Sequence, residues 1–542
     1  MKRHILATSA LPYANGSLHL GHLVETIQTD IWIRFQRSQG HTCTYVCADD
    51  AHGTPIMLSA KRQGISPETV IATFKEEHER DFKEFFIDFD CYHSTHSPEN
   101  KTLLESIFQK AKQAGVIESR PIQQAYCPSC QLFLPDRLIR GTCPFCNAED
   151  QYGDACEKCA KTYDATQLIH PFCVECNTTP IQKSSCHFFF KLAHFGDAIY
   201  DWMQDHVPPE VRHKMEEWFK QGLKDWDISR DAPYFGFLIP GSDQYFYVWV
   251  DAPIGYIAAT QKWATSHGKE GLDLWQKTTN PPIEIHHFIG KDIVYFHTLF
   301  WPAILMAADL ALPTAIHVHG FLTVNGEKMS KSRGTYITAR QYLSHLSPDY
   351  FRYYIASKLG PTIEDLDFNS DDFVYKVNAD IVNKVVNIAS RLGSIVTKKL
   401  GGTLSTIDEE GATLLSQLEH ALPEIFNQFD TLRYAHALKT IMTLAESVNK
   451  YIDDNAPWTV LHTDPERALQ VCTTGLNAFK YLMGLLKPIL PELAHKSEAF
   501  LAIPPLDKDT LSKPLIHHKI QPYQHLATRL DIAQVTAALT LQ

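Results

Sequence analysis

The spacing of apolar and polar positions at the start of the chain predicts an α/β unit. Residues 4–11 form a short apolar strand, and a turn with Asn15 and Gly16 follows it. Apolar side chains then recur at helical spacing through residues 18–39, at Leu23, Ile27, Ile31 and Phe35. Residues 42–47 resume a strand pattern. The order strand, helix, strand is typical of a parallel sheet.

The strand pattern returns after a long interruption. Between residues 117 and 182, cysteine, proline and polar turn residues replace the periodic spacing. Strand-like apolar runs resume at 244–251 and 283–289, a helical pattern covers 294–305, and a strand follows at 315–319. We therefore predict a single nucleotide-binding type of sheet that an insertion divides into two halves.

From about Asp372 onward the pattern is almost wholly helical. One apolar stripe runs along Val374, Val377, Ile381, Val385, Ile388 and Leu392. Further amphipathic helices continue to the C-terminus, so this part of the chain is predicted to be a helical bundle.

Composition narrows the class of protein. The chain has 542 residues, 44% of them hydrophobic, which is enough to bury the cores of several domains. Its formal net charge of -12 argues against non-specific binding of nucleic acid, which needs many Lys and Arg contacts to phosphate. Any recognition of RNA must then use local basic or aromatic patches.

Targeting and membrane segments are not expected. Ser9 and Pro12 break the first apolar run, and the stretch from Leu299 to Ala308 ends at Asp309, too soon to span a bilayer. We expect a cytoplasmic protein without a membrane anchor, whose thiols stay reduced.

Eight of the thirteen cysteines occur in Cys-x-x-Cys pairs, the spacing of zinc knuckles. The pairs are Cys127/Cys130, Cys143/Cys146, Cys156/Cys159 and Cys173/Cys176. Eight thiolates make two closed tetrahedral zinc sites, which are structural because no ligand position stays open. A thioredoxin-like redox motif is the alternative, but the surrounding Pro, Gly and Asp disfavour the helix start that it needs.

The spacing of the pairs leaves both sequential and nested pairing open. The remaining five cysteines are expected to be buried small apolar residues. They are Cys43, Cys47, Cys91, Cys186 and Cys472.

Two histidines flank a glycine where the first predicted strand gives way to its helix. His19 and His22 lie three residues apart and therefore share one face of the first helical turn. Gly21 lets a ligand approach the backbone, and the N–H groups and dipole of a helix start attract phosphate. Two ordinary structural histidines would explain this motif if it stood alone.

A second polar motif lies far downstream, at Lys328-Met329-Ser330-Lys331-Ser332-Arg333-Gly334. Its cations and small residues suit a loop that covers a triphosphate, although such a loop in isolation is often only a solvated basic turn. Both motifs follow strands of the same predicted sheet. They would therefore meet at its carboxyl edge, where sheets of this kind bind ligands.

Together the two motifs resemble the signatures of the class I aminoacyl-tRNA synthetases. Five further segments are similar to the methionyl-tRNA synthetase family, in its form with two zinc knuckles: residues 10–16, 49–54, 226–230, 247–256 and 288–293. The resemblance covers essentially the whole chain. Leucyl, isoleucyl and valyl enzymes share both signatures, but membership of those families would imply a much larger editing insertion.

The resemblance implies an ATP site, a catalytic set and a pairing of the cysteines. ATP, accompanied by Mg²⁺, would be bound by His19, Gly21, His22, Lys328, Ser330 and Lys331. The catalytic residues would be His19, His22, Lys328, Lys331 and Arg230. The cysteines would pair in a nested way, with Cys143, Cys146, Cys156 and Cys159 in one zinc site and the outer pairs in the other.

The amino-acid pocket also has a physical argument. Methionine is apolar and polarizable, so its pocket needs aromatic side chains and one anion for the α-ammonium. The resemblance assigns to it Leu11, Tyr13, Asp50, Trp249, Ala252, Pro253, Tyr256, Asp292, Ile293 and His297. Asp50 would hold the ammonium, whereas Trp249 and Tyr256, taken singly, are compatible with core aromatics.

The helical region carries candidates for RNA recognition. Asn383, Asn387 and Arg391 repeat every four residues beside the apolar stripe, and the segment 455–458 has the pattern of a helix start with an exposed indole at Trp458. Single-stranded RNA loops are recognised by stacking and by hydrogen bonds to base edges. A capped helix with a packed Trp is the alternative. With the resemblance, Asn387, Arg391 and Trp458 are the expected anticodon contacts.

The predicted fold class is α/β: a Rossmann-type parallel-sheet catalytic domain with a zinc-binding insertion, followed by an all-α helical bundle. The expected limits are 1–116 and 226–325 for the catalytic halves, 117–225 for the insertion, 326–372 for the lysine loop and stem-contact region, and 373–542 for the anticodon-binding domain.

The resemblance implies ATP-dependent ligation of L-methionine to tRNA(Met), initiator and elongator, by a monomer. Two other classes of protein remain as alternatives. A small-molecule nucleotidyltransferase would share the histidine motif but lack the long helical part. A zinc-bearing RNA-binding protein without catalysis would not need the lysine loop.

Overall fold

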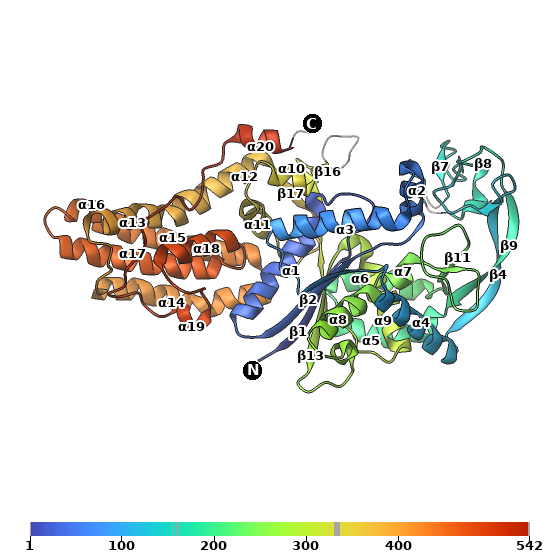
Figure 1. Cartoon of the computed structure of the whole chain (residues 1–542), viewed down its shortest axis with the longest axis horizontal. Coiled ribbons are helices and arrows are strands. Elements are labelled where there is room, and N and C mark those ends of the chain that lie inside the picture. Colours follow the sequence, from blue (N-terminus) through green and yellow to red (C-terminus); the bar gives the residue numbers. More distant parts are fainter. Residues whose placement is uncertain (1, 154–155, 160, 162, 330–335, 540–542) are drawn as a thin grey trace.

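The structure, a computed structural model, describes residues 2–153, 156–159, 161, 163–329 and 336–539 (Figure 1). Its centre is a five-stranded parallel sheet with the order β14-β13-β1-β2-β3. The strands are β1 (His4–Ser9), β2 (Thr42–Asp49), β3 (Cys91–Ser94), β13 (Ile283–Gly290) and β14 (Ala315–His319). The two strands that flank β1 come from opposite sides of the insertion, which confirms the prediction of one interrupted sheet.

Helices cover both faces of the sheet because its strands are apolar on both sides. Ile5 and Ala7 pack into the core shared with α1 (Leu20–Ser38), whereas Leu6 packs into the core shared with α8 (Ile254–Ser266). Other helices of this part are α2 (Thr54–Gln63), α3 (Pro67–Glu84), α4 (Pro98–Gln113), η3 (Gly271–Trp275), η4 (Lys291–Ile293) and α9 (Trp301–Ala307).

The insertion leaves the sheet as a long antiparallel pair of strands, β4 (Ile117–Cys127) and β9 (Ile181–Phe190). In Figure 1 these strands run along the end of the molecule that lies farthest from the helical bundle. The small elements at their tip are β5 (Leu132–Phe133), β6 (Ile139–Thr142), β7 (Gln151–Tyr152), η1 (Ala165–Gln167) and β8 (Ile169–Cys173). The chain then returns through η2 (Leu192–Phe195), α5 (Gly196–His206), α6 (Pro209–Gln221) and β10 (Trp226–Asp227).

Two predicted elements differ from the structure. The apolar run at 244–251 was predicted to be a strand, but only β12 (Tyr245–Phe246) is extended, paired with β11 (Ser229–Arg230), and the chain then turns into the short helix α7 (Val248–Asp251). A short apolar run has no period that separates strand from helix. The helix predicted at 294–305 begins with a π-helical turn, η5 (Phe296–Phe300), before α9.

The cysteines outside the pairs also differ in part from the prediction. Cys47 and Cys472 are buried as expected, but Cys43 and Cys91 are only partly buried, and Cys186 is exposed. Cys186 lies on β9 just after a run of exposed residues, before the strand becomes buried at His187.

A small mixed sheet joins the catalytic part to the helices that follow. It consists of β15 (Leu322–Val324), β16 (Glu327–Lys328) and β17 (Leu366–Phe368), with α10 (Ala339–Leu343) and α11 (Pro348–Ala356) between the last two. On α11, the fully buried Arg352 donates to the Asp30 carboxylate of α1 and to the carbonyl oxygens of Pro488 and Ile489. This buried contact fixes α1 against the C-terminal helices.

The C-terminal part is a helical bundle, as predicted. One continuous helix runs through α12 (Ser370–Lys376), the π-helical η7 (Val377–Val386) and α13 (Asn387–Lys399). The other helices are α14 (Glu409–Asp430), α15 (Tyr434–Asn455), α16 (Pro457–Val460), α17 (Pro465–Leu486), α18 (Pro491–Leu501), α19 (Lys508–Leu511) and α20 (Ile532–Leu539). None of the helices within the described residues is long and apolar enough to cross a membrane.

Candidate active site and metal centres

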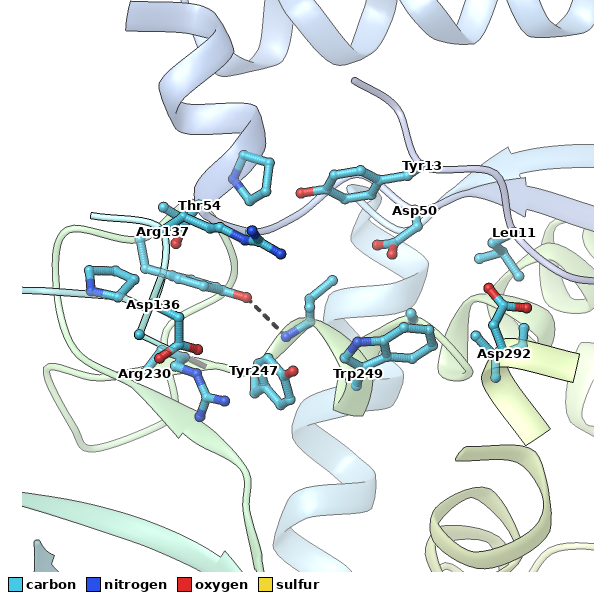
Figure 2. Close-up of a pocket in the computed structure, with 18 of the residues that line it drawn as sticks. Leu11, Tyr13, Asp50, Thr54, Asp136, Arg137, Arg230, Tyr247, Trp249 and Asp292 are labelled. Carbon is cyan, nitrogen blue, oxygen red and sulfur yellow. Dashed lines mark hydrogen bonds between the residues drawn. The ribbon is translucent and has the colours of Figure 1, made fainter. Parts of the chain in front are cut away.

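A cavity of about 1090 Å³ opens at the carboxyl edge of the central sheet (Figure 2). It collects every described residue that the sequence assigned to the ATP site, the catalytic set or the methionine pocket. These residues are Leu11, Tyr13, His19, Gly21, His22, Asp50, Arg230, Trp249, Ala252, Pro253, Tyr256, Asp292, Ile293, His297 and Lys328. Ser330 and Lys331 lie outside the described residues. The histidine motif and the described residues of the lysine motif, Lys328 and Met329, therefore line the same cavity.

The histidine motif forms the N-terminal cap of α1. His19 Nδ1 accepts a hydrogen bond from the Gly21 N–H at 3.1 Å, and His22 Nδ1 accepts one from the His19 N–H at 3.3 Å. The two rings stack with their centroids 3.6 Å apart. Because both Nδ1 atoms are acceptors, a neutral ring carries its proton on Nε2. Burial, and then the neighbouring His19, hold the pKa of His22 well below its usual value, so this ring is neutral.

The chain that follows the lysine loop is joined directly to the histidine motif. The Leu20 N–H donates to the Ile337 carbonyl at 3.0 Å, and the Ala339 N–H donates to the Leu18 carbonyl at 2.8 Å. On the other side of the loop, Lys328 ends the short strand β16, and its Nζ lies 5.8 Å from the centre of the Phe321 ring. Residues more than 300 positions apart thus form one wall of the cavity.

Arg230 enters the cavity from β11. Its guanidinium stacks on the Tyr247 ring at 3.7 Å and donates to the Ser229 carbonyl at 2.6 Å. Asp227 lies 3.5 Å from the same guanidinium. These contacts hold a fixed positive charge at the cavity wall, opposite Thr54 in Figure 2.

Aromatic side chains line the deeper part of the cavity. The Trp249 ring stacks on Phe296, with centroids 3.8 Å apart and planes 5° apart. His297 Nδ1 lies 3.1 Å from the Ile293 carbonyl and its Nε2 lies 2.9 Å from the Tyr256 hydroxyl. Burial lowers the pKa of His297 to about 4, so the ring is neutral, donates a hydrogen bond from Nδ1 and accepts one from the Tyr256 hydroxyl at Nε2. The Tyr256 hydroxyl and the His297 ring are therefore already hydrogen-bonded, and both present little charge to this end of the cavity.

Asp50 is the carboxylate beside these aromatic residues (Figure 2). Its backbone pairs with the segment that carries Tyr13: the Asp50 N–H donates to the Pro12 carbonyl at 2.9 Å, and the Ala14 N–H donates to the Asp50 carbonyl at 2.8 Å. Within the described residues, no group hydrogen-bonds the buried Oδ1 of Asp50. Burial, and then the charge of Asp251, hold the pKa of Asp50 well above its usual value. A cation that entered this place would stabilise the charged form.

The cavity also contains residues that the sequence analysis did not single out. Glu25 of α1 lies 3.3 Å from His319 Nε2 at the end of β14, and both line the cavity. Asp136 and Arg137 reach it from the insertion (Figure 2). The sequence signal for His319 was its place at the end of a predicted strand. No sequence pattern marked Asp136 and Arg137 as site residues, because they lie in an irregular segment between cysteine pairs.

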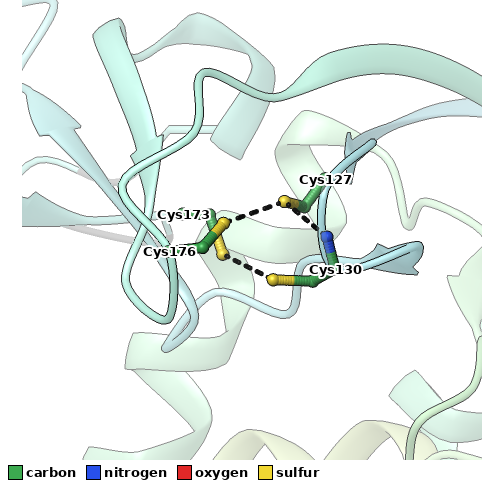
Figure 3. Close-up of side chains that lie close together, drawn as sticks. All are labelled: Cys127, Cys130, Cys173 and Cys176. Carbon is green, nitrogen blue, oxygen red and sulfur yellow. Dashed lines mark hydrogen bonds between the residues drawn. The ribbon is translucent and has the colours of Figure 1, made fainter.

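The eight paired cysteines gather into two clusters at the tip of the insertion. One holds Cys127, Cys130, Cys173 and Cys176 (Figure 3), and the other holds Cys143, Cys146, Cys156 and Cys159. Within each cluster the Sγ atoms lie within 4.8 Å of one another, which is close enough to hold a metal ion. The nested pairing is confirmed, and sequential pairing is excluded.

The anticodon candidates lie at the far end of the helical bundle. Trp458 is 38% exposed on α16, and the Arg391 guanidinium lies 4.3 Å from the centre of its ring. Arg391 also pairs with Asp453 at 2.7 Å. Asn387 begins α13 one turn before Arg391, on the same side of the helix. The structure thus places a stacking surface beside two polar side chains.

Comparisons with known proteins agree with this arrangement. A family model described as "tRNA synthetases class I (M)" matches residues 5–393, and one described as "Anticodon binding domain of methionyl tRNA ligase" matches residues 402–513. The methionine–tRNA ligases of two strains of Acidithiobacillus ferrooxidans are 52% identical over 99% of this chain and 80% of their own length.

Solved structures show the same fold. The methionyl-tRNA synthetase of Mycobacterium tuberculosis in complex with methionyl-adenylate has a TM-score of 0.78 at 24% identity, covering 97% of this chain and 99% of its own. The same protein in its free state has a TM-score of 0.73 at 23% identity, covering 98% of this chain and 99% of its own.

Proposed function

The chain belongs to the methionyl group of the class I tRNA synthetases, the methionine–tRNA ligases. From that premise we propose which role each site residue has in the reaction. ATP activates L-methionine to methionyl-adenylate, and the methionyl group passes to the 3′ end of tRNA(Met). The observation that supports our assignment of roles is the single cavity, which brings together the histidine motif, Lys328 and the aromatic pocket.

In the first step, a carboxylate oxygen of methionine attacks the α-phosphorus of ATP, and the bond from this phosphorus to the bridging oxygen of pyrophosphate breaks. His19 and His22 donate from Nε2 to phosphate oxygens at the start of α1, where the helix dipole also favours negative charge. Lys328 meets the charge that develops on the departing pyrophosphate. We assign the same role to Lys331 and a hydrogen bond to phosphate to Ser330, on the sequence motif alone.

Methionine lies with its side chain against Trp249 and Tyr256 and its α-ammonium on Asp50. A thioether is attracted to aromatic rings, and His297, held neutral, presents no charge to it. The buried Asp50 oxygen that has no hydrogen-bond partner among the described residues is the ammonium's acceptor. Arg230 lies between this pocket and the insertion, where it stabilises the negative charge of the reacting phosphate.

In the second step, a terminal ribose hydroxyl of tRNA attacks the carbonyl carbon of the adenylate, and AMP leaves. We propose that the CAU anticodon is recognised at the other end of the molecule. An unpaired base stacks on Trp458, and Asn387 and Arg391 hydrogen-bond base edges. The stack of Arg391 on Trp458 keeps both side chains in place before RNA arrives.

The two cysteine clusters fit Zn²⁺. A tetrahedral site with Zn–S bonds of about 2.3 Å has sulfur atoms about 3.8 Å apart. The Sγ pairs Cys127/Cys176 and Cys130/Cys173 lie 3.4 and 4.0 Å apart, and Cys143/Cys159 and Cys146/Cys156 lie 3.8 and 3.5 Å apart. Zinc in these closed sites supplies folding energy to the insertion and takes no part in the chemistry. Mg²⁺ enters with ATP as part of the substrate and neutralises phosphate charge.

We propose the same domain limits as those expected from the sequence: 1–116 and 226–325 for the catalytic halves, 117–225 for the insertion, 326–372 for the lysine loop and stem contacts, and 373–542 for the anticodon-binding part. It also places the enzyme in the cytoplasm as a monomer that charges both initiator and elongator tRNA(Met). Light scattering of the purified protein tests the monomer.

Charging of tRNA tests the proposal as a whole. The protein should attach labelled methionine to transcripts of initiator and elongator tRNA(Met), and should lose most of this activity when the CAU anticodon is changed. A protein that binds tRNA(Met) but attaches no methionine would instead be an RNA-binding protein without catalysis.

A further inference from the structure

A fully buried histidine, His52, lies directly behind the proposed methionine pocket. It belongs to the loop that follows β2, and its Nδ1 lies 2.7 Å from Asp251 Oδ2 on α7. Its Nε2 lies 2.9 Å from Nδ1 of His96, whose ring stacks on Phe237 with the planes 12° apart. The side chains of His52 and Asp251 are both fully buried. None of the roles assigned above uses this pair.

The pair connects two walls of the pocket. His52 is two residues after Asp50, and Asp251 is two residues after Trp249, so each partner stands behind a proposed contact of methionine. The His52 carbonyl also accepts a hydrogen bond from the Tyr13 hydroxyl at 2.8 Å. A bond between His52 and Asp251 therefore sets the distance between the Asp50 side and the Trp249 side of the pocket.

The two buried carboxylates behind and in the pocket, Asp251 and Asp50, each need a partner of opposite charge. Burial raises the pKa of Asp251, and His52 opposes that rise. Asp50 and Asp251 each have a buried Oδ1 that no described group hydrogen-bonds. Methionine brings one ammonium, so two buried carboxylates would leave one negative charge unpaired, which is costly in a low dielectric. An imidazolium at His52 would pair with Asp251 and would leave Asp50 for the ammonium.

The hydrogen bonds of His52 survive a change in its charge. Nδ1 faces a carboxylate and therefore carries a proton that it donates to Asp251. One proton also lies between His52 Nε2 and His96 Nδ1, and either ring can own it without loss of the hydrogen bond.

We propose that His52 is a positioning residue for the amino acid: through Asp251 it braces the two walls of the methionine pocket, and it neutralises that carboxylate so that Asp50 receives the α-ammonium. The inference rests on the proposed function of the pocket. It predicts that His52 acts on the affinity for methionine and not on the binding of ATP, whose proposed contacts lie at the start of α1 and on β16.

The test compares three variants of the full chain. His52→Ala removes the brace and the cation, His52→Gln keeps an amide donor within reach of Asp251 but removes the cation, and His96→Gln is the matched control that leaves the His52–Asp251 contact in place. Methionine binding is measured by equilibrium dialysis with labelled methionine, and the KM for ATP by pyrophosphate exchange. We expect His52→Ala to weaken methionine binding at least roughly tenfold, His52→Gln to weaken it less, and His96→Gln to change it little.

Imidazole provides a readout that a merely structural role would not give. Added imidazole can occupy the space left in His52→Ala, and it should restore much of the methionine affinity at an unchanged KM for ATP. Wild-type affinity in folded His52→Ala or His52→Gln would overturn the inference, as would equal losses for methionine and ATP. If His52→Ala does not fold, the methionine affinity of His52→Gln alone tests the inference. A wild-type protein that binds no methionine would instead overturn the proposed function.

Discussion

Met329 lies over Gly21, so that a Cβ added to this glycine would stand 2.5 Å from Met329 Cε and 2.9 Å from the nearest atoms of the His19 ring. The lysine loop and the histidine motif therefore touch at the one position of the motif that has no side chain. A Cβ at this position would have to displace the end of the Met329 side chain and the His19 ring, although the backbone itself would tolerate another residue.

Gly21→Ala should lower the rate of adenylate formation by roughly tenfold to a hundredfold, because the new methyl group displaces Met329 and turns the His19 ring. The KM for methionine should change little, since that pocket is elsewhere in the cavity. Pyrophosphate exchange measures both quantities. Gly16→Ala is the matched control, because a Cβ on Gly16 meets nothing within 4 Å. Equal rates in the two variants would remove Gly21 from the ATP site.

The purified protein should contain about two zinc ions per chain, one for each closed cluster of four thiolates. Cys127→Ser should lower the content to about one, because the three remaining thiolates of its cluster bind zinc more weakly. Elemental analysis of protein never exposed to a chelator gives the count. The control is Cys186→Ser, which changes an exposed cysteine outside both clusters and should keep two. A wild-type content near zero would contradict the zinc assignment.

Trp458→Ala should weaken charging of tRNA(Met) by roughly one to two orders of magnitude, since a base stacked on an aromatic ring contributes ~1–3 kcal/mol. Pyrophosphate exchange, which needs only the catalytic cavity, should stay near normal in the same preparation. Trp458→Phe keeps a ring at this position and should retain most of the charging activity. If both reactions fall together in folded Trp458→Ala, the indole supports the bundle and does not contact the anticodon.

His187 makes the stability of the insertion depend on pH. Its Nδ1 lies 2.8 Å from Asp227 and its Nε2 lies 2.9 Å from Asp231, so β9 is tied to the chain beside Arg230. Burial opposes protonation, but the hydrogen bonds to the two carboxylates prevail and raise the pKa of His187 to about 9. The unfolded value is about 6.5. The contribution of His187 to stability is therefore complete below about pH 6.5 and is lost as the pH rises to about 9.

Thermal unfolding between pH 6 and pH 9.5 checks this expectation. The Tm of the wild type should fall over the upper part of this range more steeply than the Tm of His187→Gln, which lacks the titrating group. His213→Gln removes an exposed histidine of α6 and should follow the wild type. Parallel curves for the wild type and His187→Gln would show that the imidazolium does not hold the insertion.

The order of sheet and helices followed from the sequence because long periodic segments determine it. The spacing of Leu23, Ile27 and Ile31 predicted α1, and the apolar run at 283–289 predicted β13 to within one residue. The helix at Val248–Asp251 was missed because its three apolar residues are too few to show a period. Its position also depends on contacts from other elements, such as the Tyr234 hydroxyl that accepts from the Val248 N–H at 3.0 Å.

The site could be predicted only where a residue belongs to a local motif. His19 and Lys328 were proposed as site residues because their neighbours mark a helix start and a polar loop. No local sequence pattern predicts the contact of His52 with Asp251, because the two residues lie 199 positions apart and only the fold brings them together. The resemblance supplied the nested pairing of the cysteines, which their spacing left open and which the two clusters confirm.

We propose above all that a single cavity activates methionine with ATP. The most direct measurement is ATP–pyrophosphate exchange by the wild-type protein with each of the twenty amino acids in turn, in the absence of tRNA. We predict exchange that depends on methionine and is weak or absent with the other nineteen, and we predict that Asp50→Asn raises the KM for methionine by at least roughly tenfold. Exchange with a different amino acid, or none with methionine, would contradict this proposal.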